Sequence, residues 1–563
     1  MVCVAGKCLP SARNVSKVVH MSSNTMMKMS HTHSHMLMLW GQFLDHDITL
    51  TPQRQTLTSC CTYDGVWRDS ENTGKCEPKT SVRQRLRSLQ SGGQGSGGST
   101  RISMSFDVCM ALEVDDDTFG FGHTCIDFQR SLAVPSSSCD LGYREQINQV
   151  TAFIDGSQIY GSTETMSSEL RTHVNGTLVT SRHNFLPPED NVHQQLYDEC
   201  VTSSGTENCF KAGDNRVNVQ PGLSSIHTLF MNEHNRIARI LIRQLPSTVS
   251  SNNADEFVYQ ETRKIVGALL QHITYNEFLP VLLGEANMRK YNLLNNKLKR
   301  SKLRYNSQHQ PGIRNEFATF AFRVGHSLVP EGLVPTDASY TKHGSGMAYF
   351  DNLLMNPHLL YRFGVGDVLR GVIAEPVKQP SPELSHHLEK TFRFSNRTAG
   401  GLDLAAVNIQ RGRDHGVPSY TVMRRLCRLP VPESFADLDM PDKVKNKLMR
   451  VYNSVEDIDA WTGAVSERRM PGAMIGRLNA CIIGRQFRSL RKGDRFCFPS
   501  YIAAGQLAEV YNVTLATILC NNIENMATVQ PQVFYLVQWN QLANRRVSCD
   551  QIPTLNLDSW FTK

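Results

Sequence analysis

The sequence has no apolar run long enough to cross a membrane. A membrane-spanning helix needs about 20 consecutive apolar residues, and polar or charged side chains interrupt every apolar stretch of this 563-residue chain before that length. Residues 1–10 also lack the apolar core of a signal peptide. We therefore expect no transmembrane segment, and the given chain contains no visible secretion signal.

The sequence also argues against two further classes of protein, those with structural zinc sites and those that bind nucleic acid. Its 15 cysteines do not fall into the closely spaced pairs that bind structural zinc. Its 59 basic and 52 acidic residues nearly balance, with a net charge of +7. No nucleic-acid-binding motif accompanies the basic groups at residues 83–87 and 297–304. We interpret these groups as solvated surface and expect no nucleic-acid partner.

Cysteines and glycosylation sequons together indicate an oxidising compartment. Fifteen cysteines occur with Asn-x-Ser/Thr sequons at Asn14, Asn175, Asn396 and Asn512. Because the number of cysteines is odd, at least one thiol is free or paired outside the chain. We expect a secreted, extracellular glycoprotein. Since no signal peptide is visible, we also expect that the given chain lacks its true N-terminal start.

Helical periodicity dominates, and alternating strand patterns are scarce. Apolar residues recur at helical spacing over residues 223–241 and 255–283. Length alone would allow three or four domains of about 150 residues, but no boundary is visible. We predict a mostly α protein with long loops and few short strands. It forms a single domain over residues 1–563, with a flexible Gly/Ser insertion at residues 91–100.

One short stretch carries an unusual combination of side chains. Residues 36–39 are apolar, and WGQFLDHD follows at residues 40–47. In a helix, Gln42 and His46 lie one above the other, with Asp45 and Asp47 to either side. A helix end with solvated charges is the plainer interpretation. We favour a functional site, because buried carboxylates are unfavourable unless something compensates them.

The segment TAFIDGS, residues 151–157, has oxygen-bearing groups at alternate positions. A curling chain points every second oxygen inward, as calcium loops do. A simple turn is the stronger interpretation on local grounds, because the segment has a single carboxylate; Asp47 is a candidate for a second. His31, His33 and His35 also alternate, but on a helix they would not share one face, so we do not predict a metal site there.

Six motifs occur in the order found in the animal haem peroxidase family. They are WGQFLDHDITLTP, TAFIDGSQIYGS, AGDNR, HTLFMNEHNRIA, FRVGHSLV and LDLAAVNIQRGRDHGVPSY. The resemblance covers nearly the whole chain, from Leu9 to Trp560. It implies a mostly helical catalytic domain that holds haem b and calcium, reduces hydrogen peroxide and oxidises a small donor. The family's domain normally begins before the first residue of this chain.

The resemblance also assigns roles to single residues. His46 resembles the distal histidine, Arg216 the catalytic arginine and His326 the proximal iron ligand. A distal imidazole can move a peroxide proton, an arginine can stabilise charge as the O–O bond breaks, and iron needs one axial imidazole. Further roles carried over are Gln42 for distal water or halide, Asn408 as partner of His326, Arg323 and Arg411 for the haem propionates, and Asp47, Thr151, Phe153, Asp155 and Ser157 for calcium.

The chain departs from the family where haem is held covalently. Asp45 matches one of the two carboxylates that form esters with haem in the mammalian members. The second position is Val219 and the next residue is Gln220, so neither an ester nor a sulfonium link can form there. We expect at most one covalent bond, through Asp45. Weaker oxidising power would favour iodide, bromide, thiocyanate or phenols over chloride.

The family further suggests a set of disulfides, with Cys497 as our choice for a free thiol. The suggested pairs are Cys427–Cys481, Cys520–Cys549, Cys125–Cys139 and Cys60–Cys76. Cys200 and Cys209 could also close a small local loop. Connectivity does not follow from sequence, so each pair is a hypothesis.

Two other function classes remain open. An adhesive protein on a peroxidase scaffold would bind an extracellular-matrix or cell-surface partner, and Lys492-Gly493-Asp494 resembles an integrin-binding tripeptide. A haem dioxygenase related to cyclooxygenases is the weaker alternative, because the motifs around His326 differ.

Overall fold

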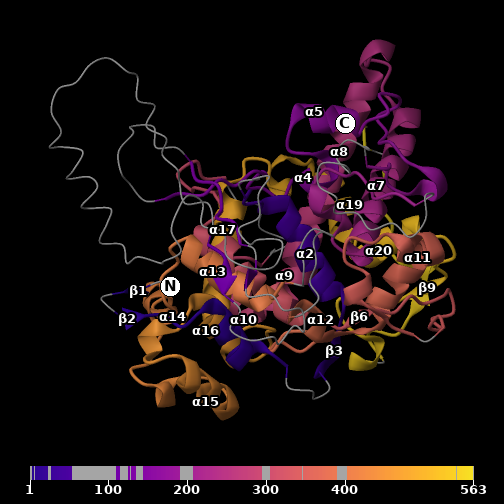
Figure 1. The fold of residues 1–563 in the computed structure, drawn as a ribbon. Helices are drawn as coiled ribbons and strands as arrows, with labels where there is room; N and C mark the ends of the chain where they lie inside the picture. The colour runs from indigo at the N-terminus through magenta and orange to yellow at the C-terminus, as the bar shows by residue number, and fades with distance from the viewer. Residues whose placement is uncertain are drawn as a thin grey trace, which may run out of the picture.

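Helices make up most of the described chain, and the strands are short (Figure 1). The computed structural model describes residues 3–4, 7–22, 27–53, 110–113, 125–126, 128–134, 144–189, 207–294, 305–344, 346–389, 402–540, 542–558 and 560–561. The α-helices are α1 (Ala12–Val15), α2 (Met36–Ile48), α4 (Ser157–Tyr160), α5 (Glu164–Glu169), α7 (Pro221–Leu241), α8 (Ala254–Ile273), α9 (Leu279–Leu283), α10 (Glu285–Lys290), α11 (His358–Ala374), α12 (His386–Glu389), α13 (Leu404–Asp414), α14 (Tyr420–Leu426), α15 (Asp442–Val451), α16 (Ala460–Ser466), α17 (Arg477–Gly493), α18 (Phe498–Tyr501), α19 (Ala504–Asn512) and α20 (Leu515–Asn522).

The described strands form two-stranded antiparallel pairs. The strands are β1 (Cys3–Val4), β2 (Lys7–Cys8), β3 (Met29–Ser34), β4 (Leu112–Glu113), β5 (Cys125–Ile126), β6 (Gly332–Leu333), β7 (Ala348–Tyr349), β8 (Pro376–Lys378), β9 (Thr528–Val529) and β10 (Val547–Ser548). They pair as β1 with β2, β3 with β8, β4 with β5, β6 with β7, and β9 with β10. The expected mostly α fold with few short strands is confirmed.

Helix α2 lies in the hydrophobic core. Its first residues, Met36 to Trp40, are all buried. Trp40 and Phe43 pack against Phe230 of α7, with ring centroids 5.8 and 5.3 Å apart. In Figure 1, α2 is the indigo helix near the middle of the view, among helices from later parts of the chain. Its apolar start therefore anchors the polar last turn deep inside the molecule.

Helix α7 begins at strong sequence signals. Pro221 occupies the first turn, and the side chain of Gln220 accepts a hydrogen bond from the backbone N–H of Gly222 at 2.7 Å. Helix α7 packs against α8, α11 and α20. Helix α8 continues through the π-helical turn η6 (Thr274–Phe278) into α9. The helical sections expected at residues 223–241 and 255–283 are confirmed.

Two of the three alternating histidines lie on a strand, and the third, His35, directly precedes α2. His31 and His33 belong to β3, which pairs with β8. The helical assumption for this segment was wrong, because pairing with residues distant in sequence fixes its backbone as extended. Across the described residues, no group of three or more His, Cys, Asp or Glu side chains is arranged to hold a metal ion.

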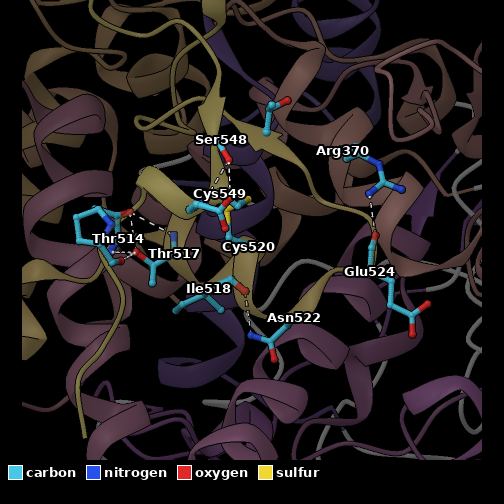
Figure 2. The surroundings of a disulfide bond; sticks show 12 residues. Arg370, Thr514, Thr517, Ile518, Cys520, Asn522, Glu524, Ser548 and Cys549 are labelled. Carbon is cyan, nitrogen blue, oxygen red and sulfur yellow. Dashed lines mark hydrogen bonds between the residues drawn. A yellow bond between two sulfur atoms is a disulfide. The ribbon is translucent and has the colours of Figure 1, made fainter. Parts of the chain in front are cut away.

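Two suggested disulfides are present, Cys427–Cys481 and Cys520–Cys549. Figure 2 shows the second, which joins the last turn of α20 to Cys549. At the start of the same helix, the hydroxyl of Thr514 accepts a hydrogen bond from the backbone N–H of Thr517 at 3.3 Å. Cys497 is a free, buried thiol, as expected. Cys8 and Cys209 are also disulfide-bonded. Together these bonds support the expectation of an oxidising compartment.

Several expectations lie outside the described residues. They concern the insertion at 91–100, the basic groups at 83–87 and 297–304, Asn396, Cys60, Cys76, Cys139 and Cys200. The side chain of Cys125 is likewise not described. Among the helices that are described, none is both long and apolar enough to cross a membrane.

Candidate functional site

A cavity of about 400 Å³ opens beside the polar half of α2. Its walls come from α2, from the segment before α7, from the 3-10 helix η9 (Phe322–Leu328) and from α13. Apolar side chains supply much of the wall, among them Phe278, Phe322, Phe350 and Val407. The polar lining includes Gln42, Asp45, His46, Arg216, Gln220, Arg323, His326 and Arg411. Segments far apart in the sequence thus bring the predicted catalytic residues into one space.

Gln42 and His46 lie one turn apart on α2 and both line this cavity. His46 is 5% exposed. Burial lowers its pKa well below the usual value of an imidazole, and the charge of Arg216 adds to this effect. The ring is therefore neutral at pH 7. Its Nδ1 has no hydrogen-bond partner in the described chain and lies 3.8 Å from Oδ1 of Asp214, so the Nε2 edge of the ring meets the cavity.

Asp214 holds Arg216 from behind the cavity. Its carboxylate accepts hydrogen bonds from Nε of Arg216 at 2.8 Å and from Nη2 at 2.7 Å. It also accepts the backbone N–H of Arg216 at 2.9 Å, which caps the 3-10 helix η3 (Asn215–Asn218). Burial alone would raise the pKa of Asp214, but the charge and hydrogen bonds of Arg216 lower it to about 2. Asp214 is not among the site residues predicted from the sequence, although its place in AGDNR, two residues before Arg216, is a usable signal.

Asp45 faces the cavity from the same turn of α2, with 33% of its side-chain surface accessible. Its Oδ1 accepts a hydrogen bond from the hydroxyl of Thr49 at 2.7 Å, and its Oδ2 lies 3.6 Å from Nη1 of Arg216. Burial raises the pKa of Asp45, while Arg216 opposes the rise. Val219 also lines the cavity. Among the described lining residues, Asp45 is the only one that carries a carboxylate.

Gln220 makes a contact that its sequence position does not reveal. Its Nε2 donates a hydrogen bond to Oε1 of Gln42 at 3.1 Å, while its own Oε1 caps α7. Gln220 is 4% exposed. Because the carbonyl oxygen of Gln42 is engaged by Gln220, the NH₂ group of Gln42 is the end left for the cavity.

His326 enters the cavity from η9. Its Nδ1 lies 2.9 Å from Nδ2 of Asn408 on α13, which is the pair that the family resemblance implies. Burial lowers the pKa of His326 to about 3, and the charge of Arg323 acts in the same direction. The ring is therefore neutral, and Nε2 is its free edge toward the cavity.

The two arginines expected to pair with propionates are not equally available. Nη1 of Arg323 donates to Oδ1 of Asn408 at 3.1 Å, and its Nε donates to the carbonyl of Ala318 at 3.1 Å. Arg411 is held more firmly: its Nη1 donates to the carbonyl of Gln129, to Ser131 and to Asp414 at 2.8 to 3.0 Å. Both side chains line the cavity, and Arg323 makes fewer competing contacts.

The cavity has the features that an iron porphyrin requires. A haem group needs apolar walls for its ring, one axial imidazole, cations for its carboxylates and an open face for the oxidant. Here the walls are largely apolar, the free edge of His326 points into the space, and Arg323 and Arg411 line it. The volume also falls in the range of about 300–1,000 Å³ that small-molecule sites occupy. The described residues therefore fit haem.

The loop at residues 151–157 meets the other side of α2. The carboxylate of Asp47 accepts the backbone N–H groups of Gly156 at 3.2 Å and Ser157 at 2.7 Å, and the hydroxyl of Ser157 at 2.9 Å. Thr151 donates its hydroxyl to Oδ1 of Asp155 at 3.0 Å. Burial raises the pKa values of Asp47 and Asp155, and the charge of Asp155 raises that of Asp47 further. Two buried carboxylates among hydroxyl and carbonyl oxygens suit a calcium ion.

Comparison with known proteins places the chain in a family. The profile described as animal haem peroxidase matches residues 2–534. The chain belongs to the animal haem peroxidase family. As a member of this family, it has a peroxidase enzyme domain.

The family relatives differ in length. A peroxidasin homologue of Caenorhabditis elegans is 36% identical over 98% of this chain and 40% of its own length. Peroxidasin of Drosophila melanogaster is 33% identical over 99% of this chain and 34% of its own length. Myeloperoxidase of Mus musculus is 34% identical over 98% of this chain and 72% of its own length. The chain thus spans about two fifths or less of these peroxidasins, but most of the myeloperoxidase.

Solved structures agree with this assignment. Peroxidase A of Dictyostelium discoideum has a TM-score of 0.71 and 26% identity, covering 93% of this chain and 91% of its own. A fatty acid alpha-dioxygenase of Arabidopsis thaliana has a TM-score of 0.68 at 16% identity, covering 92% of this chain and 77% of its own. The second likeness is one of fold alone.

The tripeptide at residues 492–494 is not presented as an adhesive loop. Asp494 is 8% exposed. Its carboxylate accepts hydrogen bonds from the backbone N–H of Phe496 at 2.7 Å and from Nε2 of Gln271 at 3.3 Å. The side chain that an integrin would have to contact is therefore buried and already hydrogen-bonded within the protein.

Proposed function

We propose that this chain is a haem-dependent peroxidase that reduces hydrogen peroxide through His46 and Arg216 and oxidises small donors. One observation carries the proposal. A neutral, buried His46, an Arg216 held by Asp214, and His326 with its Asn408 partner all line or adjoin the same cavity. Separate roles for these groups, as core histidines and a structural ion pair, would not require this convergence.

Each residue has a definite task in this proposal. When bound, haem supplies the iron chemistry that takes up peroxide and passes oxidising equivalents to the donor. Nε2 of His46 takes the proton from one peroxide oxygen and returns it to the other as water leaves. Arg216, which is always protonated, donates hydrogen bonds to the charge that develops on the leaving oxygen. His326 would hold the iron through a ring nitrogen, and the NH₂ group of Gln42 would donate a hydrogen bond to water or a halide in the cavity.

The donor class follows from the single carboxylate at the cavity edge. Asp45 can form one ester with haem, while Val219 can form none. We infer a less distorted haem with weaker oxidising power than in the doubly linked members, so iodide, bromide, thiocyanate or phenols are the expected donors. The apolar cavity wall suits phenols, and the NH₂ group of Gln42 can donate hydrogen bonds to small anions.

Calcium is the second expected cofactor. Asp47, Thr151, Phe153, Asp155 and Ser157 would bind it, with carboxylate, hydroxyl and carbonyl oxygens as ligands. The polar contacts that now join Asp47 to Gly156 and Ser157 hold these groups within reach of one another. A cation there would relieve the repulsion between the two buried carboxylates.

Spectroscopy on the haem-loaded chain tests the proposal. We expect a Soret band that shifts when hydrogen peroxide is added, because the oxidant reacts at the iron. In His46→Ala the rate of this shift should fall about 10²–10⁴-fold, the usual contribution of a positioned general base. Stopped-flow absorbance measures both rates.

His31→Ala is the matched control, because His31 is exposed on β3, away from the cavity lining. It should react with peroxide at the parent rate. A folded, haem-loaded parent chain with no peroxide-dependent shift would contradict the enzyme function, and a parent-like rate in His46→Ala would remove His46 from its role.

A further inference from the structure

A second cavity, of about 1140 Å³, lies outside the candidate haem site. Its walls come from β3, from the end of β8 and the segment after it, from the start of α15 and from the turn that joins α16 to α17. Among the described residues, the two cavities have no lining residue in common. No residue assigned above to haem, peroxide or calcium lines this second space.

Lys378 places a buried positive charge at this cavity. It is 2% exposed, and its Nζ donates to the carbonyls of Ser327 at 3.1 Å and Gln379 at 3.3 Å and to the hydroxyl of Ser381 at 2.8 Å. All three acceptors are uncharged. Burial lowers the pKa of Lys378 to about 8, although nearby carboxylates oppose the shift, so the ammonium group still carries its charge at pH 7. A buried charge is unfavourable unless it is paired.

The two carboxylates that line the cavity already have cationic partners. Glu383 accepts hydrogen bonds from Nζ of Lys447 at 2.8 Å and of Lys443 at 3.3 Å. Glu467 is 8% exposed and forms an ion pair with Arg424. Neither carboxylate is therefore left to neutralise a further cation of the lining.

Two exposed cations line the same space from different walls. Lys28 directly precedes β3, and Arg469 lies on the turn after α16. Neither side chain forms a hydrogen bond or an ion pair with a residue that the structure describes. By contrast, Arg468 of the same lining lies 3.8 Å from a carboxylate oxygen of Asp439. Lys28, Lys378 and Arg469 thus give the cavity three positive charges that form no ion pair within the described chain.

The lining also offers an aromatic and apolar wall. His33 packs against Tyr535, with ring centroids 5.0 Å apart. Burial and the charge of Arg469 lower the pKa of His33 to about 4, so its ring is neutral at pH 7 and adds no charge. Met470 and Met474 supply apolar, adaptable side chains from the turn after α16. This wall suits an apolar or aromatic body, because burying apolar surface contributes about 25 cal/mol per Å².

We propose that this second cavity binds an amphiphilic organic anion, a molecule with an acid group on an apolar or aromatic body. Arg469 and Lys28 supply charge-assisted hydrogen bonds for the carboxylate or sulfonate, and its negative charge also compensates the buried Lys378. The wall of His33 and Tyr535 contacts the body. The inference goes beyond the proposed function and does not depend on it, because the two cavities are separate.

Calorimetric titration with 1-anilinonaphthalene-8-sulfonate, an aromatic sulfonate, tests the site. The full chain is loaded with haem first, so that the other cavity is filled. We expect the parent chain to bind one equivalent of the probe. Arg469→Met and Lys28→Met should each weaken binding about 5–10-fold, since each removes a charged donor from an exposed position. Higher salt should weaken binding in the parent chain as well.

Two controls separate a site from general attraction. Arg425→Met removes the same charge from an exposed position on α14 that does not line the cavity, and should bind the sulfonate as the parent does. N-phenyl-1-naphthylamine has the same aromatic body without the acid group. Its affinity should be the same in the parent chain and in Arg469→Met, because only the acid group contacts the arginine.

The remaining results would overturn the proposal. They are a folded parent chain that does not bind the sulfonate, or one that binds it no more tightly than Arg469→Met does. Binding weakened as much by Arg425→Met as by Arg469→Met would show attraction to net charge alone. A Soret shift on adding the sulfonate, with unchanged affinity in both cavity variants, would place the probe in the haem cavity instead.

Discussion

Asp214 joins the two distal side chains that we expect to act on peroxide. It engages three donors of Arg216 and approaches Nδ1 of His46 to 3.8 Å. A hydrogen bond to a charged group contributes about 1.5–3 kcal/mol, so two such bonds to the guanidinium exceed the roughly 2 kcal/mol of rotamer entropy that an arginine loses. Arg216 is therefore already oriented before any substrate arrives, which is the condition for efficient electrostatic stabilisation.

The covalent link to haem is a prediction about two residues. After turnover with peroxide, acid-acetone should leave part of the haem on the parent chain, because Asp45 can form one ester. Asp45→Ala should release all of it, and Val219→Glu should retain more than the parent by adding a second carboxylate to the cavity. Absorbance of the extracted and retained fractions measures the result. If Asp45→Ala retained as much haem as the parent, the tether would have to lie elsewhere.

Some site residues could be predicted from sequence motifs, whereas two hydrogen bonds between them could not. His46, Arg216 and His326 lie in motifs, and the structure brings them to one cavity as the resemblance implies. The hydrogen bond from Gln220 to Gln42 and that from Arg323 to Asn408 could not be predicted. Each depends on a side-chain rotamer chosen by partners far away in the sequence, and no local pattern encodes that choice.

At the scale of elements, one turn of α2 connects the cavity to the loop at residues 151–157. His46 lines the cavity, while the next residue, Asp47, is fully buried against Gly156 and Ser157. Successive residues differ by about 100° around a helix, so neighbours can serve opposite faces. The loop is therefore hydrogen-bonded directly to the helix that carries His46.

Calcium should stabilise this connection. A ligand that binds only the folded state at 100 times its dissociation constant adds about 2.7 kcal/mol to the free energy of unfolding. We expect calcium to raise the melting temperature of the parent chain and a chelator to lower it. Asp155→Asn, which removes the loop carboxylate and leaves that of Asp47 on α2, should abolish most of this difference. A parent chain whose melting temperature ignores both treatments would contradict the calcium site.

Periodic elements were predictable from sequence, and irregular ones were not. Helices α7 and α8 follow from apolar residues at helical spacing, because each buries one face in the core. Strand β3 and the 3-10 helix η9 carry no such signal. The first is fixed by pairing with β8, and the second is a short segment whose conformation depends on its packing against α2 and α17.

For the whole molecule, buried histidines should make stability depend on pH. Burial lowers the pKa values of His20 and His234 to about 4 and that of His35 to about 3. All three are neutral at pH 7 in both states. As the pH falls below about 6.5, the unfolded chain binds protons that the folded chain rejects. By pH 5 each histidine should reduce the free energy of unfolding by about 2 kcal/mol.

Glu277 acts in the opposite direction. Burial raises its pKa to about 8, so its contribution to stability grows as the pH falls from 7 to 5 and offsets about one histidine. The urea midpoint should still be lower at pH 5 than at pH 7. In Glu277→Gln the difference between the two midpoints should widen. A midpoint that rises toward pH 5 in the parent chain would refute this balance.

The disulfides act on the molecule as a whole. Cys427–Cys481 and Cys520–Cys549 close loops of 54 and 29 residues in sequence separation. In the chain-entropy description each loop closure stabilises the fold by about 4 kcal/mol. The second bond ties α20 to the 3-10 helix η14 (Cys549–Gln551) that follows β10 (Figure 2).

Cys497 gives the molecule one more property. It is 3% exposed, and burial raises its pKa to about 12, so roughly one thiol in 10⁵ is ionised at neutral pH. The thiolate is the form that oxidants attack, and folded copies are therefore protected from the oxidants that the protein would produce. A molecule that has once unfolded exposes this sulfur, which can then be oxidised irreversibly. The fraction of molecules oxidised at Cys497 would therefore record how often the protein has unfolded.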